Sequence, residues 1–248
     1  LHLMAAARER GWRGSVAHFR GCSGEPNRLA RAYHSGDSDE IDWIVRRLRQ
    51  RMRADGEDGP LFACGISLGG NALLKWLGER GDEAGQFIEA GAGVSAPQDL
   101  AAGADALARG FSRLYTRNFL RTLVGKSLAK LDTHPGLYDA ERVRAARTFH
   151  EFDDLVTAPL HGFADCHDYW QRSSCKQYLG GVRVPTLVVN ALNDPFVPAR
   201  VLATPGDVSP RVTLDYPASG GHVGFAAGSL PGRFDWLPAR VLAFLDRR

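Results

Sequence analysis

The sequence predicts an α/β protein: a mostly parallel central sheet with helices on both faces, interrupted by a helical insertion. Short apolar runs of strand length alternate with helical patterns over residues 1–97, and the alternation resumes over residues 181–248. Between these parts, residues 98–180 show helical patterns and no convincing buried strand. We therefore divide the chain into a first core part (1–97), a helical cap insertion (98–180) and a second core part (181–248).

The first core part should contain helices and strands in alternation. The expected elements are a helix over 1–10 that stops at Gly11, a strand over 15–20, a helix that starts after Asp37, a strand over 61–64, a helix that ends near Gly78 or Gly81, and a strand over 88–97. Asp37 and Glu40 resemble a capping box. One face of the second helix carries arginines that we interpret as solvent-exposed: Arg46, Arg47, Arg49, Arg51 and Arg53.

The insertion should be helical and the second core part should again alternate. Helices are expected over 100–107, 111–130 and 140–152, followed by a looser aromatic stretch. Strands are expected over 184–192 and 211–216, with a closing helix over 236–246.

Length and composition exclude some classes of protein. The 248 residues suffice for one α/β domain with a small insertion. A net charge of +3 gives no argument for a nucleic-acid partner. No apolar run reaches the length of a membrane span. The four cysteines suggest no disulfide framework, so we expect a cytoplasmic protein. Oligomeric state is not predicted.

A strand–turn–helix motif holds the most informative residues. After the apolar run at 61–64, the chain reads Gly65-Ile66-Ser67-Leu68-Gly69 and then becomes helical. Such a turn lifts a serine hydroxyl clear of the sheet, and its glycines allow close packing and strained dihedrals. The Leu68 N–H, at the positive end of the helix, would face a developing oxyanion. Ser67 is therefore a candidate nucleophile; a glycine-rich turn with an inert serine is the alternative reading.

A base and an acid with the required placement follow later in the chain. A serine hydroxyl needs a base to remove its proton, and the base needs a partner that orients it. Asp194 lies just past the strand at 184–192, and His222 lies in a glycine-rich loop just past the strand at 211–216. Ser67, Asp194 and His222 would thus all lie at the carboxyl ends of strands, in the order serine, acid, histidine.

Other residues could compete for these roles or bind a metal. Asp194 precedes a proline and could serve the turn alone, while Asp207 and Asp215 are rival acids. No other histidine follows the last predicted strand. We also tested His161, Cys166, His167 and Cys175 as metal ligands, but the usual zinc spacings are absent. No glycine-rich phosphate loop is present either, so we expect neither a metal nor a cofactor.

A family resemblance supports this interpretation. The chain resembles the YheT-like branch of the α/β-hydrolases in motifs that span most of its length: F-R-G-C-S-G-E-P-N-R (19–28), Y-H-S-G-D-S-D-E (33–40), G-I-S-L-G-G-N-A-L-L-K-W-L-G-E (65–79), A-P-L-H-G-F-A-D (158–165), N-A-L-N-D-P-F-V-P (190–198) and G-G-H-V-G-F (220–225). The resemblance implies an α/β-hydrolase fold, a carboxylic-ester hydrolase activity, and a triad of Ser67, Asp194 and His222.

The N-terminus departs from that family. Its members have a strand and an H-G-x-x-G-type loop, which supplies a second oxyanion donor, before the first helix of this chain. We expect such a segment to precede Leu1. Without it, the strands expected at 15–20 and 61–64 lack a shared neighbour.

Three functions stay open on the sequence alone. The favoured one is a serine hydrolase that cleaves a small-molecule or lipid acyl ester through an acyl-enzyme. An acyltransferase with the same triad and a non-catalytic binding module are the alternatives. The aromatic residues of the insertion could line an acyl pocket or form its own core, and we favour the core: Phe111, Tyr115, Phe119, Phe163, Tyr169 and Trp170.

Overall fold

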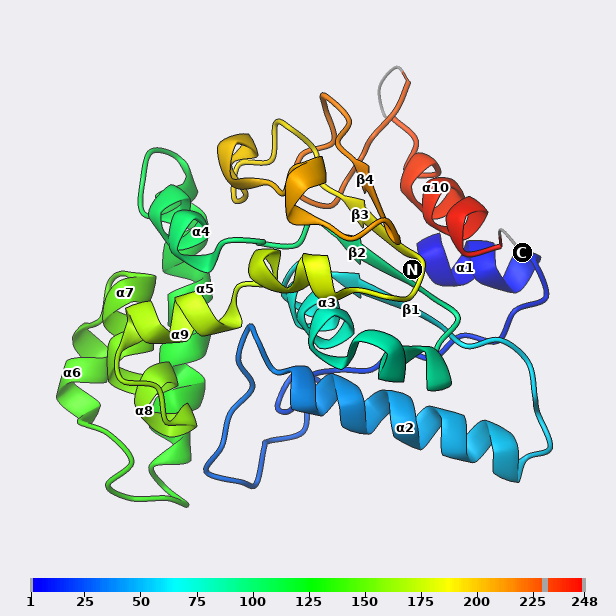
Figure 1. Cartoon of the computed structure of the whole chain (residues 1–248). Helices are drawn as coiled ribbons and strands as arrows, with labels where there is room; N and C mark the ends of the chain where they lie inside the picture. The colour runs from blue at the N-terminus through cyan, green and yellow to red at the C-terminus, as the bar shows by residue number, and fades with distance from the viewer. Residues whose placement is uncertain (1, 229–231, 247–248) are drawn as a thin grey trace.

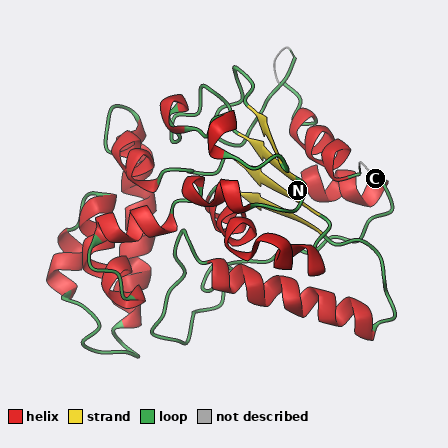
Figure 2. Cartoon of the chain, in the orientation of Figure 1, coloured by secondary structure: helices red, strands yellow, loops and turns green. Residues whose placement is uncertain are grey.

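A four-stranded, fully parallel sheet forms the centre of the protein, seen here in a computed structural model that describes residues 2–228 and 232–246. The strands run in the order β1 (Phe62–Ile66), β2 (Ala90–Val94), β3 (Thr186–Val189) and β4 (Val212–Asp215). Figures 1 and 2 show the strands at the centre with helices around them. The predicted parallel α/β architecture is confirmed.

One face of the sheet is covered by α2 (Ser38–Ala54) and α3 (Leu68–Arg80), the longest helices of the first core part. Leu73, Leu74, Trp76 and Leu77 of α3 are buried in this core. The glycines of β2 make room for this helix, because a Cβ on Gly91 would lie 2.9 Å from Leu77 and one on Gly93 2.6 Å from Leu74. The short helices η1 (Gly81–Gln86) and η3 (Lys176–Gly181) flank α3.

The opposite face is covered by α1 (His2–Glu9) and α10 (Trp236–Leu245), the first and last described helices. They pack against each other, as Figure 1 shows to the right of the sheet. Val241 and Leu245 of α10 are buried against Val94, Leu187 and Val189. As predicted, α1 is followed by Gly11 in a left-handed conformation (φ 72°).

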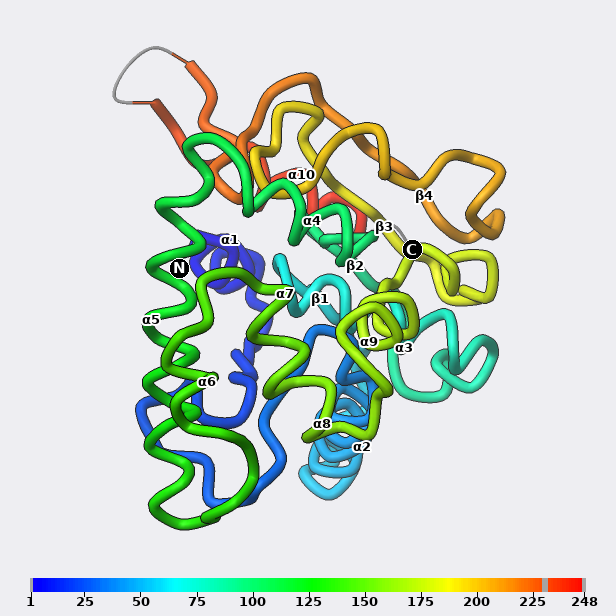
Figure 3. The backbone as a smooth tube through the Cα atoms, turned by 90° about the vertical axis from the view of Figure 1, so that its left-hand side faces the viewer, coloured from blue at the N-terminus to red at the C-terminus, as the bar shows by residue number. Residues whose placement is uncertain are grey.

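The insertion is entirely helical between β2 and η3. Its helices are α4 (Leu100–Leu107), α5 (Ser112–Lys130), α6 (Ala140–Ala145), α7 (Phe149–Phe152), η2 (Asp153–Thr157), α8 (Ala158–His161) and α9 (Cys166–Ser173). Figure 3 shows α5 running along the side of this block. The helix expected over 140–152 is broken, because Thr148 and Glu151 form a capping box that starts α7 anew. Two small cores, around Trp170 and around Phe152, hold the block together.

Asn71 of α3 connects the insertion to the sheet. Its amide nitrogen donates to the carbonyl oxygens of Ser35 and Ser173, at 2.8 and 2.7 Å, and its oxygen accepts from the Cys175 N–H at 2.9 Å. The side chain is fully buried. One amide thus satisfies backbone groups from an early loop and from the end of the insertion.

The strand expected over 15–20 is absent. Residues 12–19 have no regular structure, and Ser15 to His18 are exposed. A strand needs a neighbour for its backbone groups, and within the described residues β1 pairs only with β2. The segment therefore passes the sheet without joining it.

The interpretation of two polar features around α2 was wrong. Asp37 makes no capping bond; its carboxylate instead pairs with Arg31, while Glu40 binds Arg20 at 2.8 Å. Arg49 was expected on the solvated face but is 7% exposed. Its guanidinium donates to the carbonyl oxygens of Phe87 and Gly59. Because arginine has five donors, it can satisfy loop carbonyls inside the protein that a shorter side chain could not reach.

The remaining short helices lie between the strands of the second core part. They are η4 (Ala199–Val201) and η5 (Pro205–Asp207), both between β3 and β4.

Candidate active site

Ser67 lies in a strained turn between β1 and α3. Its backbone has φ 54° and ψ −120°, outside the helical and extended regions. Its N–H donates to the Val94 carbonyl at 2.8 Å, which ties the turn to β2. A Cβ on Gly65 would collide with the Gly69 carbonyl oxygen and come within 2.8 Å of Gly70. The close approach of strand and helix therefore requires a glycine at position 65.

The close approach predicted for Gly69 is made by its neighbour instead. A Cβ on Gly69 would meet nothing nearer than Phe19 at 4.0 Å. At Gly70, a Cβ would lie 3.1 Å from the Gly65 carbonyl and 3.2 Å from that of Val94. The helix therefore faces the strands with Gly70 rather than with Gly69.

The side chains of Ser67, His222 and Asp194 form one continuous chain of contacts. Ser67 Oγ lies 2.8 Å from His222 Nε2, and His222 Nδ1 lies 2.8 Å from Asp194 Oδ2. Asp194 is fully buried at its side chain, whereas the imidazole is 19% exposed. The three residues follow β1, β3 and β4, so the parallel sheet brings them to the edge where its carboxyl ends meet.

The hydrogen-bond pattern selects one form of the imidazole. A carboxylate can only accept, so Nδ1 carries the proton, and Nε2 accepts from the Ser67 hydroxyl. The other carboxylate oxygen, Asp194 Oδ1, accepts from the N–H groups of Phe196 and Val197 at 2.8 and 3.3 Å. The acid is therefore held from both sides. Such an arrangement can remove a proton from Ser67 while keeping the imidazole oriented.

Two polar side chains hold the loop that carries His222. Asn193 Oδ1 accepts from the N–H groups of Gly220 and Gly221, at 2.9 and 3.0 Å. Ser95, fully buried and with φ 50°, donates its hydroxyl to the His222 carbonyl oxygen. Neither residue was predicted from the sequence to support the site. Asn193 directly precedes Asp194, and Ser95 directly follows β2, so their positions at strand ends were the available signal.

Substitution of Asn193 by alanine should lower kcat for ester hydrolysis by roughly 10- to 100-fold, since small displacements of catalytic groups cost rate on that scale. The loss should fall on kcat rather than KM, because the side chain holds the His222 loop. Asn193→Asp retains the acceptor oxygen and should recover much of the rate. Steady-state kinetics of the three proteins test this; equal losses in both variants would show that acceptance by Oδ1 is not the reason.

The rival acids have other partners. Asp215 pairs with Arg240 at 2.5 Å, and Asp207 accepts from the Thr204 N–H and hydroxyl. Both carboxylates bind groups other than His222, whereas Asp194 binds the imidazole of His222.

Aromatic side chains of the insertion reach the triad through Phe196. The Phe196 ring lies 4.8 Å from the His222 ring, and Tyr115 and Phe119 of α5 pack edge-on against Phe196. The expectation that the aromatics form a core holds for Phe163, Tyr169 and Trp170. It is wrong for those of α5 and its start, because Phe111, Tyr115 and Phe119 are 75%, 45% and 40% exposed. Tyr115 and Phe119 therefore face Phe196, while Leu120 of the same helix lies in the core around Phe152.

A pair of histidines outside the triad lies between the loop at 33–37 and the insertion. The rings of His34 and His161 stand 4.4 Å apart, beside Phe163 and Tyr169. Burial, and then the positive charges of His161, Arg31 and Lys75, lower the pKa of His34 to about 3. Burial, followed by Arg31 and Arg20, lowers the pKa of His161 to about 4. Both imidazoles are therefore neutral in the folded protein at neutral pH.

This pair should make the fold sensitive to acid. The unfolded chain binds protons at these histidines below a pH of about 6.5, whereas the folded protein binds them only near 3 to 4. Stability from this source is thus complete above pH 6.5 and is lost as the pH falls, by about 2 kcal/mol at pH 5 from His34 and by less from the more exposed His161. Urea unfolding at pH 7.5 and 5 measures it. His34→Gln should flatten the dependence and the exposed His18→Gln should not; equal slopes in both would contradict the assignment.

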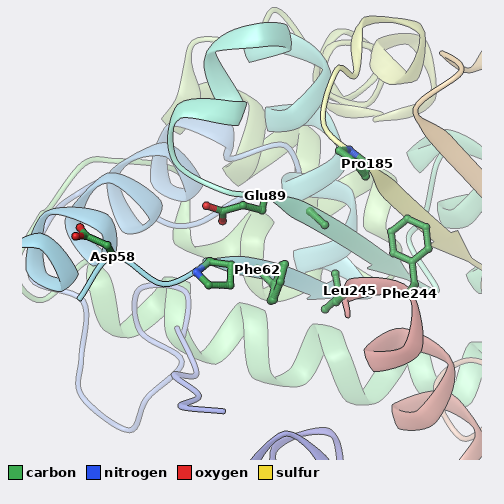
Figure 4. Close-up of a pocket in the computed structure, with 8 residues that line it drawn as sticks. Asp58, Phe62, Glu89, Pro185, Phe244 and Leu245 are labelled. Carbon is green, nitrogen blue, oxygen red and sulfur yellow. The ribbon is translucent and has the colours of Figure 1, made fainter. Parts of the chain in front are cut away.

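A hollow of about 580 Å³ lies at the other end of the sheet. Phe62, Ala90 and Pro185, at the amino ends of β1, β2 and β3, line it together with Phe244 and Leu245 of α10 (Figure 4). Ser67 follows the carboxyl end of β1. This hollow is therefore separate from the triad.

Comparisons with known proteins agree with this fold. The family model of the α/β hydrolase fold matches residues 2–228. The candidate esterase YheT of Escherichia coli K12 is 39% identical over 241 residues, which cover 96% of this chain and 69% of that protein. Mouse phospholipase ABHD3 is 29% identical over 252 residues, covering 100% of this chain and 57% of the relative. Yeast monoacylglycerol lipase is 28% identical, covering 85% of this chain and 47% of the relative.

Solved structures share the fold at low sequence identity. A mutant of the meta-cleavage product hydrolase CumD aligns with a TM-score of 0.56 at 15% identity, over 100% of this chain and 84% of that one. An esterase from Exiguobacterium antarcticum aligns with a TM-score of 0.55 at 15% identity, over 98% and 85%. The chain belongs to the α/β-hydrolase family, and within it to the branch of YheT. None of the helices described in the structure is long and apolar enough to cross a membrane.

Proposed function

We propose that the protein is a serine hydrolase that cleaves carboxylic acyl esters with Ser67, His222 and Asp194. The observation that supports this most directly is the pair of 2.8 Å contacts that joins Ser67 Oγ to His222 and His222 to Asp194. The relatives described above include an esterase, a phospholipase and a monoacylglycerol lipase, which agrees with an ester substrate.

The proposed reaction has two halves. Ser67 Oγ attacks the acyl carbon while His222 Nε2 takes the hydroxyl proton, and the imidazolium then gives that proton to the departing alcohol. Water next attacks the acyl-enzyme with His222 again as base, which releases the acid and restores Ser67. Asp194 orients the ring and stabilises its charged form. The Leu68 N–H, one of the first in α3 and without an intrahelical acceptor, would donate to the oxyanion.

The substrate proposed is a short-chain or lipid acyl ester with an apolar group beside the triad. Phe196 packs against His222, and Tyr115 and Phe119 extend an apolar surface outward from it. Burying such surface favours an acyl chain. We propose that residues 98–180 act as a cap over the triad, because Tyr115 and Phe119 of α5 supply part of this apolar surface. The four cysteines are all free thiols, which supports a reducing compartment such as the cytoplasm.

A fluorophosphonate probe tests the proposal, because it labels only an activated serine. Wild type should be labelled and should hydrolyse p-nitrophenyl esters of graded chain length, whereas Ser67→Ala should do neither. Ser219→Ala removes an exposed hydroxyl near His222 and should behave as wild type. Equal labelling of wild type and Ser67→Ala would refute the scheme. Product analysis with added alcohols separates hydrolysis from acyl transfer, and absence of labelling would favour a binding module.

A further inference from the structure

Three side chains that commonly bind metals meet in the insertion, outside the triad. His150 comes from α7, and Cys166 and His167 begin α9. The two Nε2 atoms lie 3.3 Å apart, and the potential ligand atoms of all three residues lie within 4.8 Å of one another. Both histidines are exposed, whereas Cys166 is buried.

Neighbouring residues hold the two imidazoles in place. The Trp170 ring packs edge-on against both, with centroid distances of 5.8 Å to His150 and 5.6 Å to His167. Trp170 is itself 6% exposed and donates its indole N–H to Asp153 at 2.9 Å. One fixed indole therefore sets the positions of both rings, so the cluster does not depend on two free side chains meeting by chance.

The distance between the two imidazole nitrogens matches that expected around a tetrahedral ion. Zinc binds imidazole nitrogen at about 2.0 to 2.1 Å, so two such nitrogens at the tetrahedral angle lie about 3.3 to 3.4 Å apart. At 3.3 Å, either one Nε2–H donates to the lone pair of the other nitrogen, or both lone pairs bind one ion that lies between them. A thiol and two imidazoles form a donor set that suits Zn²⁺.

The charges around Cys166 also favour a cation. Asp154 accepts from the Cys166 N–H at 3.1 Å, and Asp165 directly precedes Cys166 in the chain. The ligand form of a thiol is the thiolate, so metal binding would release the thiol proton to solvent. The carboxylates that disfavour a lone thiolate would favour a divalent ion at the same place.

We propose that His150, Cys166 and His167 bind a Zn²⁺ ion that links α7 to α9, with water in the remaining position. This departs from the expectation of no metal site. That expectation considered Cys166 and His167 but not His150, which lies on a different helix at a spacing that matches no standard zinc pattern. Only the packing of α7 against α9 through Trp170 brings the three together. The proposal is independent of the reaction at Ser67.

Metal binding by tag-free, chelator-treated protein tests the inference. Titration with Zn²⁺ should show one site by calorimetry, a rise in Tm, and proton release. Co²⁺ should produce the thiolate-to-cobalt charge-transfer band. His150→Ala should weaken Zn²⁺ binding by at least the roughly 10- to 100-fold that even outer partners of metal ligands contribute. Cys166→Ser should abolish the charge-transfer band. The exposed His18→Ala serves as the matched control and should bind as wild type.

The outcomes separate a built site from adventitious binding. Loss of binding in His150→Ala and Cys166→Ser, with Tm values in chelator close to wild type, supports the site. Unchanged Zn²⁺ affinity in His150→Ala, an equal loss in His18→Ala, or a cobalt complex without the thiolate band would each overturn it. Fluorophosphonate labelling of Ser67 in the same variants should persist, which keeps this test distinct from that of the catalytic proposal.

Discussion

Substitution of Ser67 by alanine is expected to lower kcat for ester hydrolysis by about 10⁴- to 10⁶-fold, the scale seen when a nucleophile of this kind is removed. No other oxygen can take its place, because His222 Nε2 faces Ser67 Oγ at 2.8 Å. His222→Ala should cost about as much, and the double variant little more, because the two groups act as one unit. Asp194→Asn should cost about 10⁴-fold, since an amide would favour the wrong tautomer of the imidazole.

Single-turnover and steady-state kinetics on one p-nitrophenyl ester measure these losses. Circular dichroism and Tm should stay near wild type for Ser67→Ala, because a hydroxyl is removed without a change in packing. A His222→Ala protein with nearly full activity, or losses that multiply in the double variant, would contradict the proposed relay from Asp194 through His222 to Ser67.

Substitution of Gly65 by alanine is expected to destabilise the protein by about 3 kcal/mol or more, the upper range for overpacking against rigid neighbours. The new Cβ would meet the Gly69 carbonyl and come within 2.8 Å of the Gly70 Cα, and backbone atoms cannot turn aside as side chains do. Because the collision lies within the turn that presents Ser67, labelling of any folded fraction should fall as well.

Gly69→Ala provides the matched control for this prediction. It adds the same methyl group four residues away, but the nearest atom is Phe19 at 4.0 Å. Alanine also favours helix over glycine, so the free energy of unfolding should stay the same or rise by up to about 1 kcal/mol. Urea unfolding of both variants decides the matter. Similar destabilisation in the two would mean that strand and helix do not approach as closely as the structure shows.

The sequence was most informative where local pattern and chemistry coincide. The apolar run before Gly65 and the helical spacing after Gly69 predicted β1, the turn and α3, which the structure contains. The placement of Asp194 and His222 after strands was predictable because parallel strands end at one edge. Their contact distances were not, since these depend on Asn193 and Ser95, whose bonds reach across loops far apart in the chain.

The wrong predictions have one physical origin: they depend on contacts between residues far apart in the chain, which sequence periodicity cannot predict. Arg49 has the spacing of a solvated residue, but carbonyls of Phe87 and Gly59 lie within its reach. The run at 15–20 has the composition of a strand, but no neighbour pairs with it among the described residues. The sequence does not predict that His150 lies near Cys166, because their proximity depends on the packing of Trp170 against His150.

Among the described residues, the strand that carries the nucleophile pairs on one side only, with β2. Leu61 and Ser67 bond toward β2, so the alternate residues Phe62, Cys64 and Ile66 direct their backbone groups the other way. Such a row can pair with an extended segment that lies alongside it. A segment that paired there would lie directly beside Ser67, so it would also help to shape the access of an ester to the hydroxyl.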